Sequence, residues 1–263
     1  MPARHHVAIV IPVHSPKIKP LEELSLRRCQ KILAAYPKLL VCPEGMDASP
    51  YHGLLADLEV RAFAPAFFQS DRGYNRLLRL PDFYARFPDV EHLLIYQADC
   101  YVFTDRLRDF LDRPYDYIGA PWTNFDWLRK ASPMLRFVPG LDRVLKRVGN
   151  GGFSLRRVEV FREVAERFAW LGSRMDVHED LYWCQLVSRL GGRPVMAGFD
   201  EALRFAFESE PARCLALAGG RLPFGCHAFE RCGLAFWRNH LDPDELQAAG
   251  LTPAAASDQS VGP

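Results

Sequence analysis

The 263-residue sequence lacks both an excess of charge and a long apolar run. Its 33 lysines and arginines are balanced by 32 aspartates and glutamates, which leaves a net charge of +1. Proteins that hold nucleic acid usually carry a basic surface, so we expect no nucleic-acid partner. No run approaches the roughly 18 apolar residues that span a bilayer. The N-terminal apolar stretch is not followed by a small-residue cleavage site, which favours a buried strand over a signal peptide. We therefore expect a cytoplasmic protein.

Several common functional motifs are also missing. The seven cysteines are odd in number and include no C-x-x-C pair, which favours reduced thiols over a disulfide framework. Pro12 and His14 follow the first apolar run where a dinucleotide-binding protein would carry G-x-G-x-x-G. The sequence contains neither a G-x-x-x-x-G-K-[ST] loop nor a G-x-S-x-G elbow. These absences disfavour a Rossmann dehydrogenase, a P-loop enzyme and a serine hydrolase.

The pattern of apolar residues indicates an α/β fold. Hydrophobic residues make up 49% of the chain and charged residues 25%, the balance of a globular protein. Apolar runs predict buried strands, and segments with helical spacing between them predict helices. We expect strands at 7–13, 39–42, 58–63 and 92–98, and helices at 21–35 and 71–79. This alternation is typical of a mostly parallel sheet with helices on both faces. We expect one domain over residues 1–240 and a partly disordered tail over 241–263.

The second half of the chain is less regular. We expect amphipathic helices at 158–171 and 179–190, the latter ending at two glycines. Residues 122–147 mix aromatic and basic side chains. This segment is either a solvated helical insertion or an acceptor-side insertion that closes over a ligand or contacts a membrane.

Four features could carry chemistry, and each also has an ordinary structural explanation. Asp99 ends the best buried strand, where ligands bind in open α/β sheets and where a carboxylate can hold a divalent cation or simply form a turn. The glycine-rich segment 149–152 permits close approach of a ligand or forms a tight turn. Glu179 and Asp180 open a helix, where they either complement the helix dipole or accept a proton from a substrate. His227 is either a core histidine or a second metal ligand, better suited to Mn²⁺ than to Mg²⁺.

In their order along the chain, these features resemble GT-A-type glycosyltransferases, and more closely the DUF5672 family. The resemblance covers roughly residues 5–235, and GNGGFSLR followed by Glu-Asp is its most specific part. It rests on five segments, namely YQADCYVF (96–103), YDYIGAPW (115–122), VGNGGFSLRR (148–157), EDLY (179–182) and FGCHAF (224–229).

The resemblance implies a GT-A-like, Rossmann-like fold that binds a nucleotide-sugar donor, with a UDP-sugar favoured, across the first strand. Asp99 is similar to the first aspartate of the family's D-x-D metal motif, but Tyr101 stands where the second would be. The metal ligands implied are Asp99 and His227, and the ion is Mn²⁺ or Mg²⁺. The residues implied to contact the donor are Pro12, His14, Arg72, Asn75, Gln97, Asp99, Gly151 and Gly152.

Glu179 and Asp180 are similar to the x-E-D motif of inverting GT-A enzymes, in which the aspartate is the catalytic base and the glutamate binds the acceptor. The resemblance thus implies an inverting glycosyltransferase of bacterial polysaccharide or glycoconjugate biosynthesis. The acceptor would be a glycan, a lipid-linked sugar or a small hydroxyl compound, with peripheral contact to the inner face of the membrane as one option. The alternatives are a retaining transferase, a nucleotidyltransferase, and a nucleotide- or carbohydrate-binding module without turnover. The glycosyltransferase hypothesis requires Asp99 and Asp180 to converge on one crevice.

Overall fold

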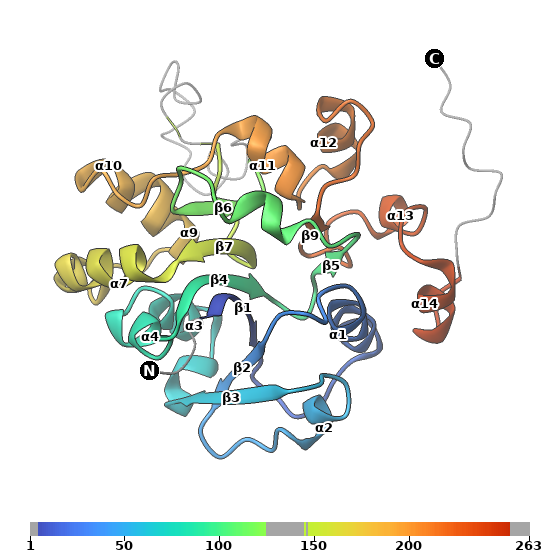
Figure 1. Cartoon of the computed structure of the whole chain (residues 1–263), viewed down its shortest axis with the longest axis horizontal. Coiled ribbons are helices and arrows are strands. Elements are labelled where there is room, and N and C mark those ends of the chain that lie inside the picture. The colour runs from blue at the N-terminus through green and yellow to red at the C-terminus, as the bar shows by residue number, and fades with distance from the viewer. Residues whose placement is uncertain (1–4, 125–144, 146, 253–263) are drawn as a thin grey trace.

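A computed structural model describes residues 5–124, 145 and 147–252, and its centre is a six-stranded sheet (Figure 1). Most of the 122–147 segment therefore lies outside the described residues. In spatial order the strands are β3 (Leu58–Phe63), β2 (Lys38–Pro43), β1 (His5–Pro12), β4 (Val90–Tyr96), β7 (Phe153–Arg157) and β6 (Tyr117–Gly119). The first four run parallel, and β7 runs antiparallel to both of its neighbours. The mostly parallel sheet predicted from the sequence is confirmed.

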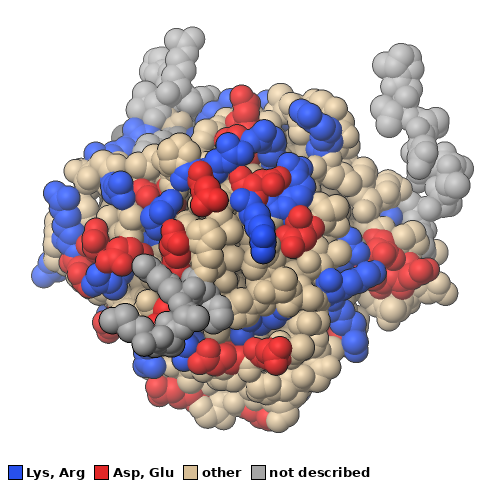
Figure 2. Space-filling view, viewed as in Figure 1, with Lys and Arg blue, Asp and Glu red and all other residues tan. Residues whose placement is uncertain are grey.

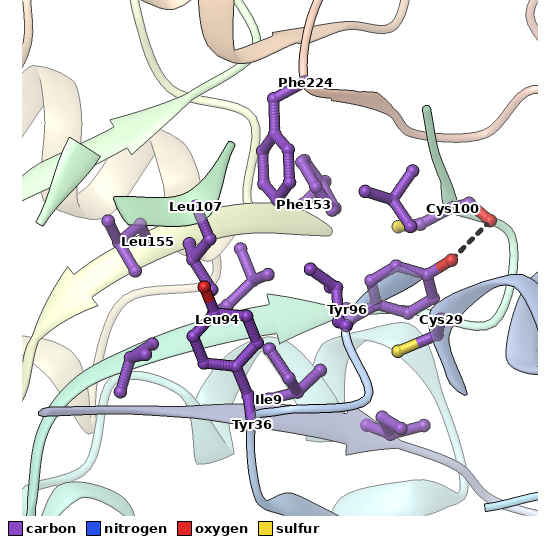
Figure 3. Packing of buried hydrophobic residues seen from close by; sticks show 14 of the residues in the cluster. Ile9, Cys29, Tyr36, Leu94, Tyr96, Cys100, Leu107, Phe153, Leu155 and Phe224 are labelled. Carbon is purple, nitrogen blue, oxygen red and sulfur yellow. Dashed lines mark hydrogen bonds between the residues drawn. The ribbon is translucent and has the colours of Figure 1, made fainter. Parts of the chain in front are cut away.

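The central strands are apolar throughout because both faces of the sheet are covered. Side chains of successive residues in a strand point to opposite faces. Ile9 and Ile11 accordingly pack into one core cluster, and Ala8 and Val10 into the other. The first cluster, shown in Figure 3, also holds the aromatic rings of Tyr96 and Phe153. A continuous apolar run is what such a doubly covered strand requires.

Helices cover each face, as expected. The first face packs against α1 (Pro20–Ile32), α2 (Ser49–His52) and the 3₁₀ turn η2 (Leu107–Phe110). The opposite face packs against α3 (Asp71–Leu77), α4 (Pro81–Ala85), α7 (Val158–Arg167) and the π-helical segment η4 (Tyr182–Val187). Short elements complete this part of the chain, namely η1 (Pro65–Phe68), α8 (Ala169–Gly172), α9 (Glu179–Leu181) and α10 (Ser188–Leu190).

A small second sheet, in the order β5-β9-β8, brings distant parts of the chain to one place. It consists of β5 (Tyr101–Val102), β9 (Gly225–Cys226) and β8 (Ala206–Phe207). Tyr101 pairs with Cys226, and Phe207 pairs with Cys226 from the other side. The residues that follow β4, β8 and β9 therefore lie side by side. Helices α11 (Phe199–Phe205), α12 (Pro211–Leu217) and α13 (Leu234–Trp237) share one core cluster with this sheet.

Part of the segment expected as a tail is folded. Helix α14 (Pro243–Ala248) begins after Asp242, whose carboxylate caps the helix, and Leu246 is fully buried. Glu245 forms an ion pair with Arg28 of α1 at 3.1 Å, so α14 packs beside α1 (Figure 1). An aspartate cap and one buried leucine are enough to hold such a short helix when a preformed surface is available.

The charge of the surface and the length of the helices can be read from the structure. In Figure 2, basic and acidic side chains are interspersed over the face shown. Among the described parts of the chain, none of the helices combines the length and the apolar character needed to cross a membrane.

Candidate active site

The candidate site lies at the edge of the sheet where β1 and β4 end. The two strands are parallel and adjacent, so Pro12 at the end of β1 and Gln97 after β4 lie at the same edge. The antiparallel strand β7 begins there, with Phe153 opposite Tyr96. The amide of Gln97 donates to the carbonyl of Gly152 at 3.0 Å. The glycine-rich segment thus lies at the carboxyl edge of the parallel strands, where open α/β sheets bind ligands.

Asp99 lies in a tight turn whose side chains face this edge. The Cys100 amide closes the turn on the Gln97 carbonyl at 2.9 Å, and the Tyr96 hydroxyl lies 3.2 Å from the Cys100 carbonyl (Figure 3). Asp99 Oδ1 is 3.2 Å from His227 Nε2, and Oδ2 is 2.7 Å from Arg231. Burial by itself would raise the pKa of Asp99, but the two cationic partners lower it to about 2. Asp99 is therefore a half-buried carboxylate that stays ionised.

His227 links this turn to the second sheet. Its Nδ1 is 3.0 Å from Glu208 Oε1, and its Nε2 is 2.9 Å from Gln97 Oε1. Burial would lower the pKa of His227, but hydrogen bonds to Asp99 and Glu208 and their charges raise it to about 9. The next residue, Ala228, has a φ of 52°, a left-handed conformation that costs a non-glycine residue about 1 kcal/mol. That turn allows Arg231 to reach back to Asp99.

Glu208 is a site residue that the sequence analysis missed. It directly follows β8 and bonds His227 through one carboxylate oxygen and the Asn150 amide through the other. The signal that could have indicated it is the one that indicated Asp99, an acidic residue directly after a short apolar run (LRFAF, 203–207). The run is short and lies within a helical pattern, so its strand character was not evident.

Gly151 and Gly152 are required for close packing. Neither has a positive φ. A Cβ atom on Gly152 would overlap the imidazole of His227, and one on Gly151 would overlap the carboxylate of Glu179. Two consecutive glycines therefore lie between the Asp99–His227 group and the Glu179–Asp180 group. The close approach that these glycines permit in the structure is that of the protein's own side chains.

Glu179 is an anchored residue at the start of α9. Its Oε1 accepts from Arg156 at 2.8 Å, and both side chains are buried. Its backbone amide donates to Asn75 Oδ1 at 2.7 Å. Its second oxygen, Oε2, is buried and has no hydrogen-bond partner among the described residues. Such an orphaned acceptor is costly unless a ligand or water satisfies it.

Asp180 differs from Glu179 in that no cationic side chain among the described residues bonds it. It is half-buried, and its Oδ1 accepts from the adjacent amide of Leu181 at 2.7 Å. Burial and the charge of Glu179 raise the pKa of Asp180 to about 8, and Glu208 adds to the effect. Because Glu208 acts on both Asp180 and His227, the two halves of the site share one electrostatic environment.

The remaining sequence-predicted residues lie apart from this cluster or have other partners. Arg72 is exposed and pairs with Asp176 at 2.9 Å. The Asn75 amide donates to the Asp71 carbonyl at 2.7 Å, and its oxygen holds the start of α9, so both of its polar groups are used within the protein. His14 is exposed two residues beyond β1. Tyr101 points away, with its hydroxyl donating to Glu245 at 2.8 Å.

The residues around Asp99 fit a divalent cation. Ligand atoms of Asp99, Cys100 and His227 lie within 4.8 Å of one another. Asp99 Oδ1 is buried and forms no well-aligned hydrogen bond with the described residues, which leaves it available to an ion. The Cys100 thiol is less suited, because burial and the neighbouring Asp99 raise its pKa well above the usual value and it donates to the Gly152 carbonyl at 3.4 Å. Carboxylate oxygen and imidazole nitrogen together suit Mn²⁺.

Comparison with known proteins gives one family and one fold. The family described as "Protein of unknown function (DUF5672)" matches residues 57–227. No functionally curated protein matches the chain significantly. The galactosyltransferase LgtC, in complex with donor and acceptor sugar analogs, is similar in structure, with a TM-score of 0.54 and 16% identity over 95% of this chain and 98% of LgtC. The apo bifunctional glycosyltransferase WbbM gives a TM-score of 0.53 and 11% identity over 95% of this chain and 50% of WbbM.

Proposed function

The chain belongs to the DUF5672 family and has the GT-A fold, and from this premise we propose that it is a glycosyltransferase. The reaction proposed is transfer of a sugar from a nucleotide-sugar, with a UDP-sugar favoured, to a hydroxyl group. One observation carries the proposal: Gly151 packs against Glu179 and the next residue, Gly152, packs against His227, so the neighbours of Asp180 and Asp99 lie against adjacent residues. This arrangement provides a place for a leaving diphosphate beside a place for an incoming alcohol.

The donor side is formed by the edge of β1 and β4. We infer that the nucleotide lies across Pro12 and His14, with its diphosphate near Asp99. Arg231 is 65% exposed and bonds Asp99, so its guanidinium can also reach a phosphate. Asp99 and His227 would hold Mn²⁺ or Mg²⁺. When bound, such an ion supplies positive charge that stabilises the leaving nucleoside diphosphate.

The acceptor side is formed by α9. In the proposed reaction Asp180 accepts the proton of the acceptor hydroxyl. The hydroxyl oxygen forms a bond to the anomeric carbon while the bond from that carbon to the diphosphate oxygen breaks, so the configuration inverts. A general base is most effective when its pKa is near the working pH, and the raised pKa of Asp180, about 8, meets this condition. The orphaned Oε2 of Glu179 can accept a hydrogen bond from the acceptor.

We infer a role in polysaccharide or glycoconjugate biosynthesis in the cytoplasm. A glycan, a lipid-linked sugar or a small hydroxyl compound would serve as acceptor. With a lipid-linked acceptor, the transfer would take place at the inner face of the membrane.

A binding module without turnover is the second candidate, and one observation favours it. Tyr101 replaces the second aspartate of the D-x-D motif and bonds Glu245, so this position contributes no carboxylate. A weakened metal site would bind a nucleotide-sugar and leave its anomeric bond intact.

The test is incubation with a panel of UDP- and GDP-sugars and Mn²⁺. We expect hydrolysis of one donor, transfer to a hydroxyl acceptor, and loss of both in Asp99→Asn and Asp180→Asn variants. NMR of the product shows whether the anomeric configuration inverts, and retention would remove Asp180 from the role of base. Donor binding without hydrolysis or transfer would favour the module instead.

A further inference from the structure

We propose that Gln97 supplies the metal ligand that the motif lacks at Tyr101, and that Glu208 is the carboxylate that orients His227 toward the ion. The inference rests on the metal site of the proposed function. It extends that site by a ligand and a positioning residue that the D-x-D pattern does not contain.

The first argument is the spacing of three polar atoms. Around His227 Nε2 lie Gln97 Oε1 at 2.9 Å and Asp99 Oδ1 at 3.2 Å. Neighbouring ligands of an octahedral ion, each about 2.1 Å from it, are separated by about 3 Å. Nε2 can carry only one hydrogen, so hydrogen bonding satisfies one of the two oxygens well and leaves the other poorly aligned. Asp99 Oδ1 is the oxygen left without a well-aligned donor.

The second argument is that the backbone fixes Gln97 and Asp99 on one side of the turn. The Gln97 amide is bonded to Gly152, and its carbonyl accepts from Cys100. Gln97 therefore cannot shift without breaking the junction between β4 and the glycine-rich segment. An amide oxygen, a carboxylate oxygen and an imidazole nitrogen form a donor set that suits Mn²⁺ better than a soft thiophilic ion.

The third argument is that Tyr101 cannot take this role. It belongs to β5, where its backbone pairs with Cys226, and its ring is buried. Its hydroxyl bonds Glu245 of α14, and the Arg28 guanidinium covers its ring at 4.8 Å. An oxygen at position 101 would therefore point into the packing between α1 and α14, whereas Gln97 already points at His227.

The fourth argument concerns Glu208. Histidine ligands of metals almost always donate their second ring N–H to a carboxylate, a carbonyl or water, which fixes the tautomer and the ring orientation. Glu208 accepts from His227 Nδ1 at 3.0 Å, and Asn150 holds its other oxygen. This leaves Nε2 directed at Gln97 and Asp99. Glu208 is on the far side of the ring from the ion, so it acts as a positioning residue.

The test of Gln97 is a titration with Mn²⁺ alone, in which EPR of the free ion measures binding. The melting temperature of each variant measures its stability. Gln97→Leu should weaken Mn²⁺ binding at least tenfold at an unchanged melting temperature. Gln97→Glu, which keeps an oxygen at the same place and adds a charge, should bind Mn²⁺ more tightly than the wild type. Equal affinity in the wild type and Gln97→Glu would refute the ligand role, even if Gln97→Leu failed to fold.

The test of Glu208 compares the same substitution, glutamate to glutamine, at positions 208 and 210. Removal of a carboxylate that orients a metal-bound histidine typically costs 10- to 100-fold in metal affinity. We expect Glu208→Gln to lose about 10-fold or more. Glu210→Gln should match the wild type, because Glu210 bonds Thr123 and Asn124 and not His227. Electron spin echo spectra of bound Mn²⁺ should show nitrogen coupling that weakens in Glu208→Gln and persists in Glu210→Gln. Equal behaviour of the two variants would overturn the positioning role.

These outcomes separate the inference from the proposed function. Mn²⁺ binding that depends on Gln97 and Glu208, with no sugar transfer from any donor, would sustain the inference and refute the transferase. Transfer by a protein that binds no Mn²⁺ would sustain the transferase and refute the inference.

Discussion

The substitution Gly152→Ala should weaken metal binding without preventing the protein from folding. The glycine packs so closely on His227 that a Cβ there would overlap the imidazole nitrogen Nε2. An ordinary carbon contact is about 3.5 Å, so the ring would have to move by more than about 1 Å. A shift of this size breaks the 2.9 and 3.2 Å approaches of Nε2 to Gln97 and Asp99.

The expected effects of Gly152→Ala follow from this displacement. A 1 Å misplacement at a catalytic site costs about 10²-fold in turnover. Overpacking of a close contact costs about 1–3 kcal/mol of stability. We therefore expect Mn²⁺ affinity to fall at least tenfold and turnover by about 10²-fold, in a protein that still folds cooperatively.

Two further glycine variants serve as controls in the same assays. Gly151→Ala meets the Glu179 carboxylate instead, so it should lower turnover while Mn²⁺ affinity persists. Gly53→Ala meets only an ordinary contact of 3.5 Å, at a φ of −71° that alanine adopts readily, and should match the wild type. Wild-type Mn²⁺ affinity in Gly152→Ala would refute the reasoning, because the imidazole would then tolerate the displacement.

Three other predictions test the role of Asp180 as the base and the burial of Glu179 beside it. Asp180→Asn should lower turnover by about 10²-fold with donor binding retained, measured by steady-state kinetics and thermal shift; near-normal turnover would exclude Asp180 as the base. Burial raises the pKa of Asp180 to about 8, with the charges of Glu179 and Glu208 adding to the effect and that of Arg156 opposing it. Because the base must be ionised, kcat/KM should rise about tenfold per pH unit below that value and level off above it. A profile that is flat between pH 6 and 9 would contradict this. Arg156→Met should destabilise the fold by about 3–5 kcal/mol in urea unfolding, because it leaves the Glu179 charge buried and unpaired, and Glu179→Leu in the same chain should recover part of the loss.

Local patterns in the sequence predicted the main elements well. The strands expected at 7–13, 39–42, 58–63 and 92–98 correspond to β1, β2, β3 and β4 with ends that differ by a few residues. The helix expected at 158–171 is divided into α7 and α8 at Phe168, whose φ of −108° ends the first helix. Apolar periodicity depends on neighbours within a few residues, so it can be recognised from the sequence alone.

The short elements of the C-terminal third were not predicted. Strands β8 and β9 have two residues each, too few for a period of two to be recognised. They exist because they pair with each other and with β5 over a surface that the rest of the chain has already formed. Glu208 depends on this pairing, and for that reason the sequence did not identify it.

By itself, the sequence determined the four parallel strands, the position of Asp99 shortly after β4, and a helix that begins with Glu179 and Asp180. Only the tertiary structure decided that Glu179 is buried on Arg156, that no cation in the described part of the chain bonds Asp180, and that Tyr101 points at Glu245. Local structure follows from contacts between residues close in the chain. The site follows from the antiparallel return of β7 and from the β5-β9-β8 pairing. These pairings bring together residues far apart in the chain, such as Gln97 and His227, which are 130 positions apart, and no short pattern encodes such contacts.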